Sequence, residues 1–225
     1  MNKTIQSLIK ELVKIEVSGK KLINGTVIDL GSDMLVLFNG TNYMYIPFEH
    51  IHNFEVDQNN EEEIQGPTED PSIKALGNQQ ELSFKETLEI AIGKYLEIYV
   101  TDNQPLHGQI TSVQDDYFVF YSPIYKTMYI PIAHLKWLIP YVQNESLYGL
   151  NEKNRIIRSN SELLAKTFKK QIEKFIHRIV VLNIGGVKSH NGKINNLNEQ
   201  VLEMQKARAN TQYLNIDHIK TLHLV

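Results

Sequence analysis

The chain repeats itself three times with a period of about 84 residues. A tyrosine and a histidine recur at this spacing, at Tyr45, Tyr129 and Tyr213 and at His50, His134 and His218. The surrounding strings agree, reading YIPFEHI at 45–51, YIPIAHL at 129–135 and YLNIDHI at 213–219. An internal repeat restricts the fold strongly, because every copy must bury an equivalent set of apolar side chains.

Other positions follow the same register. A glycine opens a strand-like string in each copy, at Gly25, Gly108 and Gly192. Apolar residues also recur at offsets of three and four, the spacing of one helix face, at Ile5, Leu8, Ile9 and Leu12, at Leu88, Ala91, Ile92 and Tyr95, and at Ile172, Phe175, Ile176 and Ile179. Directly after each helical pattern, apolar residues alternate with a period of two, as in Val13, Ile15 and Val17. This alternation is typical of a strand with one buried face.

The remainder of each copy predicts four more short strands. In the first copy they lie near residues 25–30, 34–38, 42–47 and 51–56. The predicted fold is therefore mainly β with short helices, each copy being a helix followed by five antiparallel strands. Because closure of a sheet hides its edges, we expect each copy to form a small Sm-like or SH3-like barrel.

Composition separates the copies. We predict barrel units at 1–56, 82–142 and 161–225, joined by an acidic linker at 57–81 and a polar connector at 143–160. The linker carries seven Asp and Glu against one Lys, which is typical of a solvated segment. The third unit carries ten Lys and Arg against five Asp and Glu. An acidic middle and a basic end would favour head-to-tail association, although both surfaces could equally be solvated without a partner.

Bulk properties exclude several classes of function. The chain has no cysteine, which excludes disulfides, thiolate nucleophiles and cysteine-ligated zinc. Its formal net charge of −3 gives no broad attraction to nucleic acid or to an anionic membrane. Charged residues interrupt the apolar positions near the N-terminus, and no apolar run is long enough to cross a bilayer. We expect a chain that is made in the cytoplasm and is not inserted into a membrane.

The repeated residues have a structural interpretation and a functional one. Histidine can act as a metal ligand or a base, but these three precede the last predicted strand at a turn, where a ring nitrogen can bind backbone groups. His50 and His52 lack a third ligand at a recognisable spacing, so we predict no metal site and no cofactor. We interpret the tyrosines as core or rim residues, and the glycines as positions where a strand bends or another backbone comes close.

Two further groups are candidate interaction surfaces. Tyr117 and Tyr121 alternate with Phe118 and Phe120, so they are expected on the outer face of the second unit. Exposed tyrosines there could form an adhesive patch, although ordinary strand tyrosines would show the same pattern. The third unit has basic residues on its predicted helix, including Lys169, Lys170 and Lys174.

Enzymatic activity is not predicted, because the sequence has no phosphate-binding glycine loop, no nucleophile elbow and no HExxH motif. An Sm-like barrel could bind single-stranded RNA or DNA, and this is the alternative function. It is disfavoured because PFEHI, PIAHL and NIDHI stand where an Arg-Gly pair would precede the last strand.

The tandem YIPxxHI-type strings, with the Gly-Gly of LNIGGVKSHNGKI at 182–194, resemble the spore coat protein B family of bacilli. The resemblance covers all three units. The first two units lack the Gly-Gly turn, and no Ser/Lys-rich tail follows Val225, so the modification of that tail is not carried over. The resemblance implies a non-catalytic coat component, made in the mother cell and deposited on the forespore through contacts with other coat proteins. Association with itself into a homo-oligomer is a further expectation.

Overall fold

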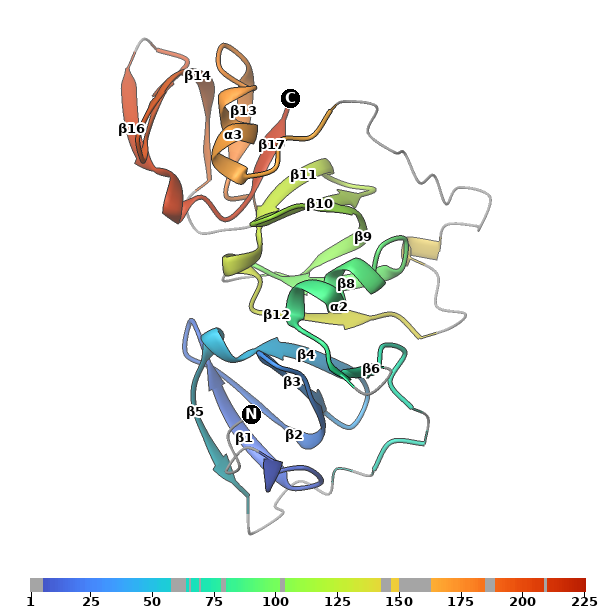
Figure 1. Ribbon diagram of the computed structural model, residues 1–225. Coiled ribbons are helices and arrows are strands. Elements are labelled where there is room, and N and C mark those ends of the chain that lie inside the picture. The colour runs from blue at the N-terminus through green and yellow to red at the C-terminus, as the bar shows by residue number, and fades with distance from the viewer. Residues whose placement is uncertain are drawn as a thin grey trace. The chain divides into compact units, whose positions relative to one another are not determined.

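A computed structural model describes residues 6–57, 64, 66–68, 70–77, 80–101, 104–142, 147–149, 163–184, 189–208 and 210–225. The chain is mainly β (Figure 1), which confirms the predicted class. Two α-helices occur in this described part, α2 (Phe84–Ile90) and α3 (Phe168–Glu173). Neither they nor any other described segment forms a helix of the length and apolar content that a bilayer crossing requires.

The first repeat contains every strand that its sequence predicts. Its elements are β1 (Leu12–Val17), β2 (Lys21–Leu30), β3 (Met34–Phe38), β4 (Tyr43–Pro47), the 3-10 turn η1 (Phe48–His50) and β5 (Ile51–Val56). In β1, Val13, Ile15 and Val17 are buried while their neighbours are more exposed, as the period of two requires. The helix predicted before β1 lies partly at residues 1–5, outside the described residues.

The second and third repeats have the same series of elements. The second consists of α2, β8 (Tyr95–Tyr99), β9 (Leu106–Val113), β10 (Tyr117–Ser122), β11 (Lys126–Pro131), η2 (Ile132–His134) and β12 (Trp137–Pro140). The third consists of α3, β13 (Ile179–Leu182), β14 (His190–Asn198), β15 (Val201–Gln205), β16 (Thr211–Asn215), η5 (Ile216–His218) and β17 (Leu222–Leu224). The short elements β6 (Leu76–Gly77), β7 (Gln80–Glu81) and η3 (Leu147–Gly149) lie between repeats.

Local sequence sets where the helices begin. The Ser83 hydroxyl accepts a hydrogen bond from the Glu86 backbone N–H, and the Glu86 carboxylate accepts one from the Ser83 backbone. This capping box satisfies two of the N–H groups that a helix start leaves without a partner. Thr167 has the same position before α3, where its side chain accepts from the Lys170 N–H.

The chain divides into two compact units that do not coincide with the repeats. One comprises 1–98 with 136–145, and the other comprises 99–135 with 146–225. Neighbouring strands in the first unit follow the order β8-β12-β4-β3-β2-β1-β5, and those in the second follow β16-β15-β14-β13-β17-β11-β10-β9. The first and third repeats therefore share one internal strand order, in which the last strand lies beside the first.

The repeated glycines lie where the second strand of each repeat passes close to the third. A side chain added at Gly25 would place its Cβ 2.6 Å from the Phe38 carbonyl oxygen, and one at Gly192 would be 2.5 Å from that of Gln205. At Gly108 the Cβ would overlap the Tyr121 carbonyl oxygen. Three residues after each glycine, one extra residue interrupts the ladder as a β-bulge, at Ile28, Thr111 and Asn195. Glycine and bulge together allow the strand to bend strongly.

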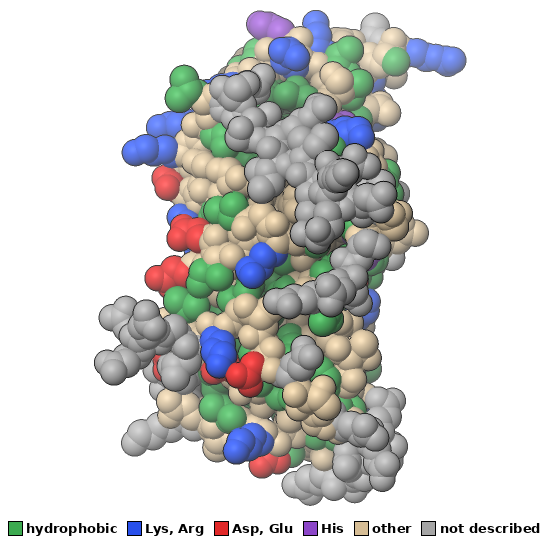
Figure 2. All heavy atoms as spheres, turned by 90° about the vertical axis from the view of Figure 1, so that its right-hand side faces the viewer, with side chains coloured by type: hydrophobic (Ala, Val, Ile, Leu, Met, Phe, Trp, Pro, Cys, Tyr) green, Lys and Arg blue, Asp and Glu red, His purple; other side chains and the backbone are tan. Residues whose placement is uncertain are grey.

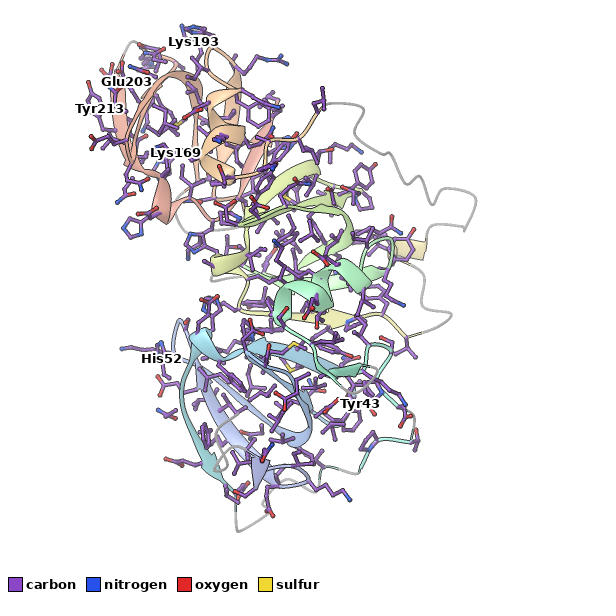
Figure 3. All side chains as sticks on the ribbon, in the orientation of Figure 1. Tyr43, His52, Lys169, Lys193, Glu203 and Tyr213 are labelled. Atoms are coloured by element: carbon purple, nitrogen blue, oxygen red, sulfur yellow. The ribbon has the colours of Figure 1, made fainter. Side chains whose placement is uncertain are left out.

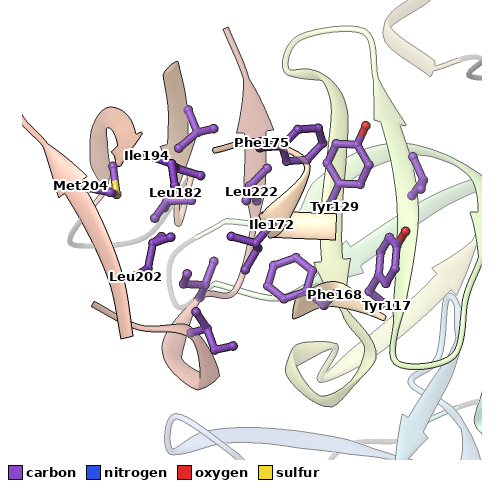
Figure 4. Packing of buried hydrophobic residues seen from close by; sticks show 14 residues of the cluster. Tyr117, Tyr129, Phe168, Ile172, Phe175, Leu182, Ile194, Leu202, Met204 and Leu222 are labelled. Atoms are coloured by element: carbon purple, nitrogen blue, oxygen red, sulfur yellow. The ribbon is translucent and has the colours of Figure 1, made fainter. Parts of the chain in front are cut away.

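An apolar cluster in the second compact unit joins β10 and β11 to the third repeat (Figure 4). Phe168 and Ile172 of α3 contribute to it together with Leu182, Leu202 and Leu222. Because these residues come from two repeats, the third repeat does not bury its apolar surface alone.

Part of the acidic linker is packed against the first repeat. Ile73 and Ala75 are buried, and the Ala75 N–H donates to the Asp29 carboxylate at 3.0 Å. The prediction of a fully solvated linker is therefore wrong at these positions, because burial of two apolar side chains outweighs the acidic composition around them. Most of the predicted connector at 143–160 and the Gly185-Gly186 pair lie outside the described residues.

The close approach at Gly108 yields a stability prediction. Gly108→Ala should destabilise the protein by about 1–3 kcal/mol, because the added methyl must displace backbone rather than a flexible side chain. Thermal unfolding followed by circular dichroism measures the effect. Gly66→Ala is the matched control, since nothing lies within 4 Å of a Cβ there. Equal melting temperatures for the two variants would contradict this account of the repeated glycine.

Candidate interaction site

The last strand of one repeat pairs with the fourth strand of the repeat before it, and this happens twice. In the first compact unit β12 pairs with β4, with Leu138 opposite Tyr45. In the second, β17 pairs with β11, with Leu222 opposite Tyr129. Both pairs are antiparallel, and the facing residues are related by the 84-residue period. We call each of these contacts a junction; one occurs within each compact unit.

Each junction also holds the helix of the following repeat. The Phe84 N–H at the start of α2 donates to the Asp33 carboxylate at 2.6 Å, and the Phe168 N–H at the start of α3 donates to that of Asp116 at 2.7 Å. A backbone bond accompanies each, from Ser32 to Leu82 and from Asp115 to Lys166, both 3.0 Å long. A carboxylate at a helix start satisfies a free N–H and interacts favourably with the helix dipole.

The third repeat lacks this aspartate. Equivalent backbone bonds fix the alignment, because the carbonyls of Asp33, Asp116 and Gln200 accept from Phe48, Ile132 and Ile216 respectively. Gln200 therefore stands where the first two repeats have a helix-capping carboxylate. These residues are not among the predicted site residues, although the strings DMLV, DYFV and QVLE carry the signal in the repeat register.

The repeated tyrosine has a different environment in the last repeat. Tyr45 is fully buried, its hydroxyl donating to the Ile73 carbonyl at 2.5 Å, and burial raises its pKa well above the usual value. Tyr129 is also buried, with its ring centroid 5.0 Å from that of Phe175. Tyr213, which lies on β16 (Figure 3), is 66% exposed. The position is thus buried in the first two repeats and exposed in the third.

The tyrosines expected on an outer face do not form an exposed row. Tyr117 is fully buried, and its hydroxyl donates to the Ala165 carbonyl at 2.7 Å and lies 3.1 Å from the Gln171 amide oxygen. Alternation correctly separates Tyr117 from Phe118, but α3 covers the face on which Tyr117 lies (Figure 4). Tyr121 is half-buried. An exposed adhesive patch at these tyrosines is therefore wrong.

The repeated histidines all end a 3-10 turn before the last strand. His50 places Nδ1 3.1 Å from the Ser18 hydroxyl. His134 is half-buried and hydrogen-bonded to the Asp217 backbone, and burial lowers its pKa despite this bond. His218 is exposed. Within the described residues, no three His, Asp or Glu side chains come close enough to hold a metal ion.

The predicted basic residues lie on or next to α3. Lys170 and Lys174 are exposed and Lys169, labelled in Figure 3, is half-buried. The Lys174 ammonium donates to the Leu163 carbonyl at 2.5 Å. Figure 2 shows further Lys and Arg side chains (blue) on one face of the third repeat, at the top of the view. The basic character predicted for this repeat is thus present at its surface.

An apolar cavity of about 220 Å³ lies inside the first repeat. Its lining residues are all apolar, namely Leu8, Val13, Ile15, Val27, Leu30, Leu35, Phe48, Ile51 and Phe54. A ligand site normally adds a few polar groups that orient the ligand. The junctions, rather than this cavity, carry the chain's repeated and specific polar contacts.

Comparison with known proteins finds one family. The profile of the YwrJ third domain matches residues 167–222, which span α3 to β17. The chain is 32% identical to the uncharacterized protein YwrJ of Bacillus subtilis (strain 168) over 225 residues, covering 99% of each chain.

The capping aspartates predict a position-specific effect on stability. Asp116→Ala should destabilise the protein by about 1–2 kcal/mol, because the first N–H of α3 loses its acceptor inside a packed junction. Gln200→Ala, at the equivalent position of the third repeat, is the control and should change stability by less than about 0.5 kcal/mol. Urea unfolding measures both, and equal losses would show that Asp116 has no capping role.

The environment of His134 predicts a pH dependence. Because its pKa is lowered by folding, the unfolded chain binds a proton more readily, and stability contributed by neutral His134 is lost as pH falls below about 6.5. His134→Gln should therefore lose less stability than the unmodified protein between about pH 7.5 and 5.5. Urea midpoints across this range test the difference, with the exposed His218→Gln as control. Parallel pH profiles for His134→Gln and the unmodified protein would refute the assignment.

Proposed function

The chain belongs to the YwrJ family, and we propose that it is a non-catalytic structural protein of the spore coat that assembles through protein–protein contacts. The observation that carries the proposal is the repeated junction. Twice in one chain, the fourth strand of a repeat binds the last strand of the next. A protein whose most specific contacts join one repeat to another is suited to assembly.

We propose further that the three repeats are tandem Sm-like or SH3-like barrels. Support comes from the shared strand order of the first and third repeats, in which the last strand lies beside the first. The bend at the repeated glycine and bulge, present in all three repeats, is the device that small barrels use to curl a sheet.

A structural role accounts for the polar residues that sequence alone would make catalytic candidates. His50 contacts Ser18, and His134 contacts the backbone of the next repeat. The buried tyrosine hydroxyls of Tyr45 and Tyr117 bind backbone carbonyls. These groups each have a stabilising partner, which supports a structural role over a reactive one.

The coat assignment rests on the YIPFEHI, YIPIAHL and YLNIDHI strings and the Gly-Gly of the third repeat, which resemble the spore coat protein B family. On this proposal the protein is synthesised in the cytoplasm of the mother cell and deposited on the forespore surface. Its partners are other coat proteins and further copies of itself.

Single-stranded nucleic acid is the second candidate ligand. Exposed Lys170 and Lys174, together with exposed Tyr213, give the third repeat both basic and aromatic groups at its surface. Proteins that bind single strands combine such groups. The same residues are equally available to an acidic protein partner, and the chain's formal net charge of −3 gives no broad attraction to nucleic acid.

Localisation distinguishes these functions. A fluorescent fusion of the full chain should accumulate only during sporulation and surround the forespore, because a coat protein is deposited on that surface. A diffuse signal in growing cells would overturn the coat assignment. In parallel, the purified protein should not retard single-stranded oligonucleotides at low salt, where phosphate contacts are strongest. Retardation that is lost when Lys169, Lys170 and Lys174 are neutralised would establish the second candidate instead.

A further inference from the structure

We infer that β16 and β5 are the two halves of one further junction, which forms between two copies of this chain. In this contact, β16 of one copy pairs with β5 of the next. The inference rests on the proposed assembly function and specifies its contact surface.

Each of the two strands lies at an edge. In the part of the chain that the structure describes, β16 has β15 as its sole strand neighbour and β5 has β1. Their counterparts elsewhere have two neighbours, since β4 lies between β3 and β12, and β17 lies between β13 and β11. An edge strand offers a row of backbone donors and acceptors to another strand, and native proteins rarely leave a long one uncovered.

The repeat fixes which residues would face each other. Tyr213 corresponds to Tyr45 and Tyr129, and Phe54 corresponds to Leu138 and Leu222. In both internal junctions the tyrosine lies opposite the leucine. The same register places Tyr213 of one copy opposite Phe54 of the next, an aromatic pair that stabilises antiparallel strands.

Exposure at the two edges agrees with a missing neighbour. Tyr213 is 66% exposed and Phe54 is 38% exposed, whereas their counterparts in the junctions are buried. Val201, at the start of β15, is exposed too, while Met34 and Tyr117 at the same position are fully buried under the next repeat. Apolar side chains thus remain uncovered at the positions that a following repeat would cover.

Charge favours a second copy as the occupant. The β16 edge belongs to the repeat with ten Lys and Arg against five Asp and Glu. The β5 edge belongs to the first repeat, whose residues 1–56 carry five Lys against six Asp and Glu. The net charges of these two repeats are therefore opposite in sign, which steers head-to-tail encounters and opposes contacts between two third repeats. Such a heterologous contact builds rings if it closes and filaments if it does not.

The proposed junction between two copies should be weaker than the two junctions within the chain. Gln200 supplies no carboxylate where Asp33 and Asp116 accept a hydrogen bond from a helix start. The contact must also be made between separate chains, which costs translational and rotational freedom. We therefore expect an association that depends on protein concentration.

Cysteine cross-linking tests the register directly, because the natural chain has no cysteine. Tyr213→Cys protein and Phe54→Cys protein are mixed and oxidised mildly. Directly opposite residues on antiparallel strands have Cα atoms about 4.5–5.5 Å apart, within disulfide reach. The mixture should give cross-linked dimers in roughly tenfold excess over a mixture of Ile124→Cys and Phe54→Cys, since pairing raises the effective thiol concentration. Ile124 is a suitable control because it is exposed outside the proposed edges.

Sedimentation velocity of the full chain supplies a second measurement. The unmodified protein should form larger species as its concentration rises, and Tyr213→Glu should shift this rise to higher concentration, while the exposed control Leu163→Glu should not. Cross-linking no better than the Ile124 control, with monomers at every concentration, would overturn the inference. If the junction is overturned in this way but the fluorescent fusion still surrounds the forespore, the proposed coat function is retained. Specific cross-linking with a diffuse fusion would instead support the junction and remove the coat assignment.

Discussion

The pairing of each repeat's last strand with the fourth strand of the repeat before it is the contact on which the rest of the structure depends. A sheet of five short strands leaves two edges whose backbone groups need partners. When an edge strand of one repeat pairs with an edge strand of the next, the backbone groups of both edges find partners. The pairings of Tyr45 with Leu138 and of Tyr129 with Leu222 are the two cases. Because the helix of the next repeat is capped from the same surface, strand pairing and helix position are set together.

This arrangement explains why equivalent residues differ between repeats. Asp33 and Asp116 are useful only where a helix start follows, and the third repeat has Gln200 there. Tyrosine is kept in all three repeats, yet Tyr213 alone is exposed. Its retention is understandable if that surface is covered in an assembly, since an amphipathic ring can be buried or solvated at modest cost.

Much of the local fold could be predicted from residue patterns. Alternation located β1, and the repeat register transferred the strands of the first copy to the other two. The burial of Tyr117 could not be predicted, because alternation separates the two faces of a strand without showing which element covers each face. The burial of Ile73 and Ala75 could not be predicted either, since two apolar residues within an acidic segment give no periodic signal. The junctions depend on contacts between residues about 90 positions apart, which no local pattern encodes.

Amide hydrogen exchange of β5, β12, β16 and β17 tests the central claim most directly. Each of these strands is the last strand of its repeat or lies at an edge. If the junctions hold the repeats together, the amides of β12 and β17 exchange slowly, at rates close to those of the central strands of their own repeats. At low protein concentration, those at the outer edges of β5 and β16 exchange much faster. Fast exchange throughout β12 and β17, comparable with that of the outer edges, would contradict the account.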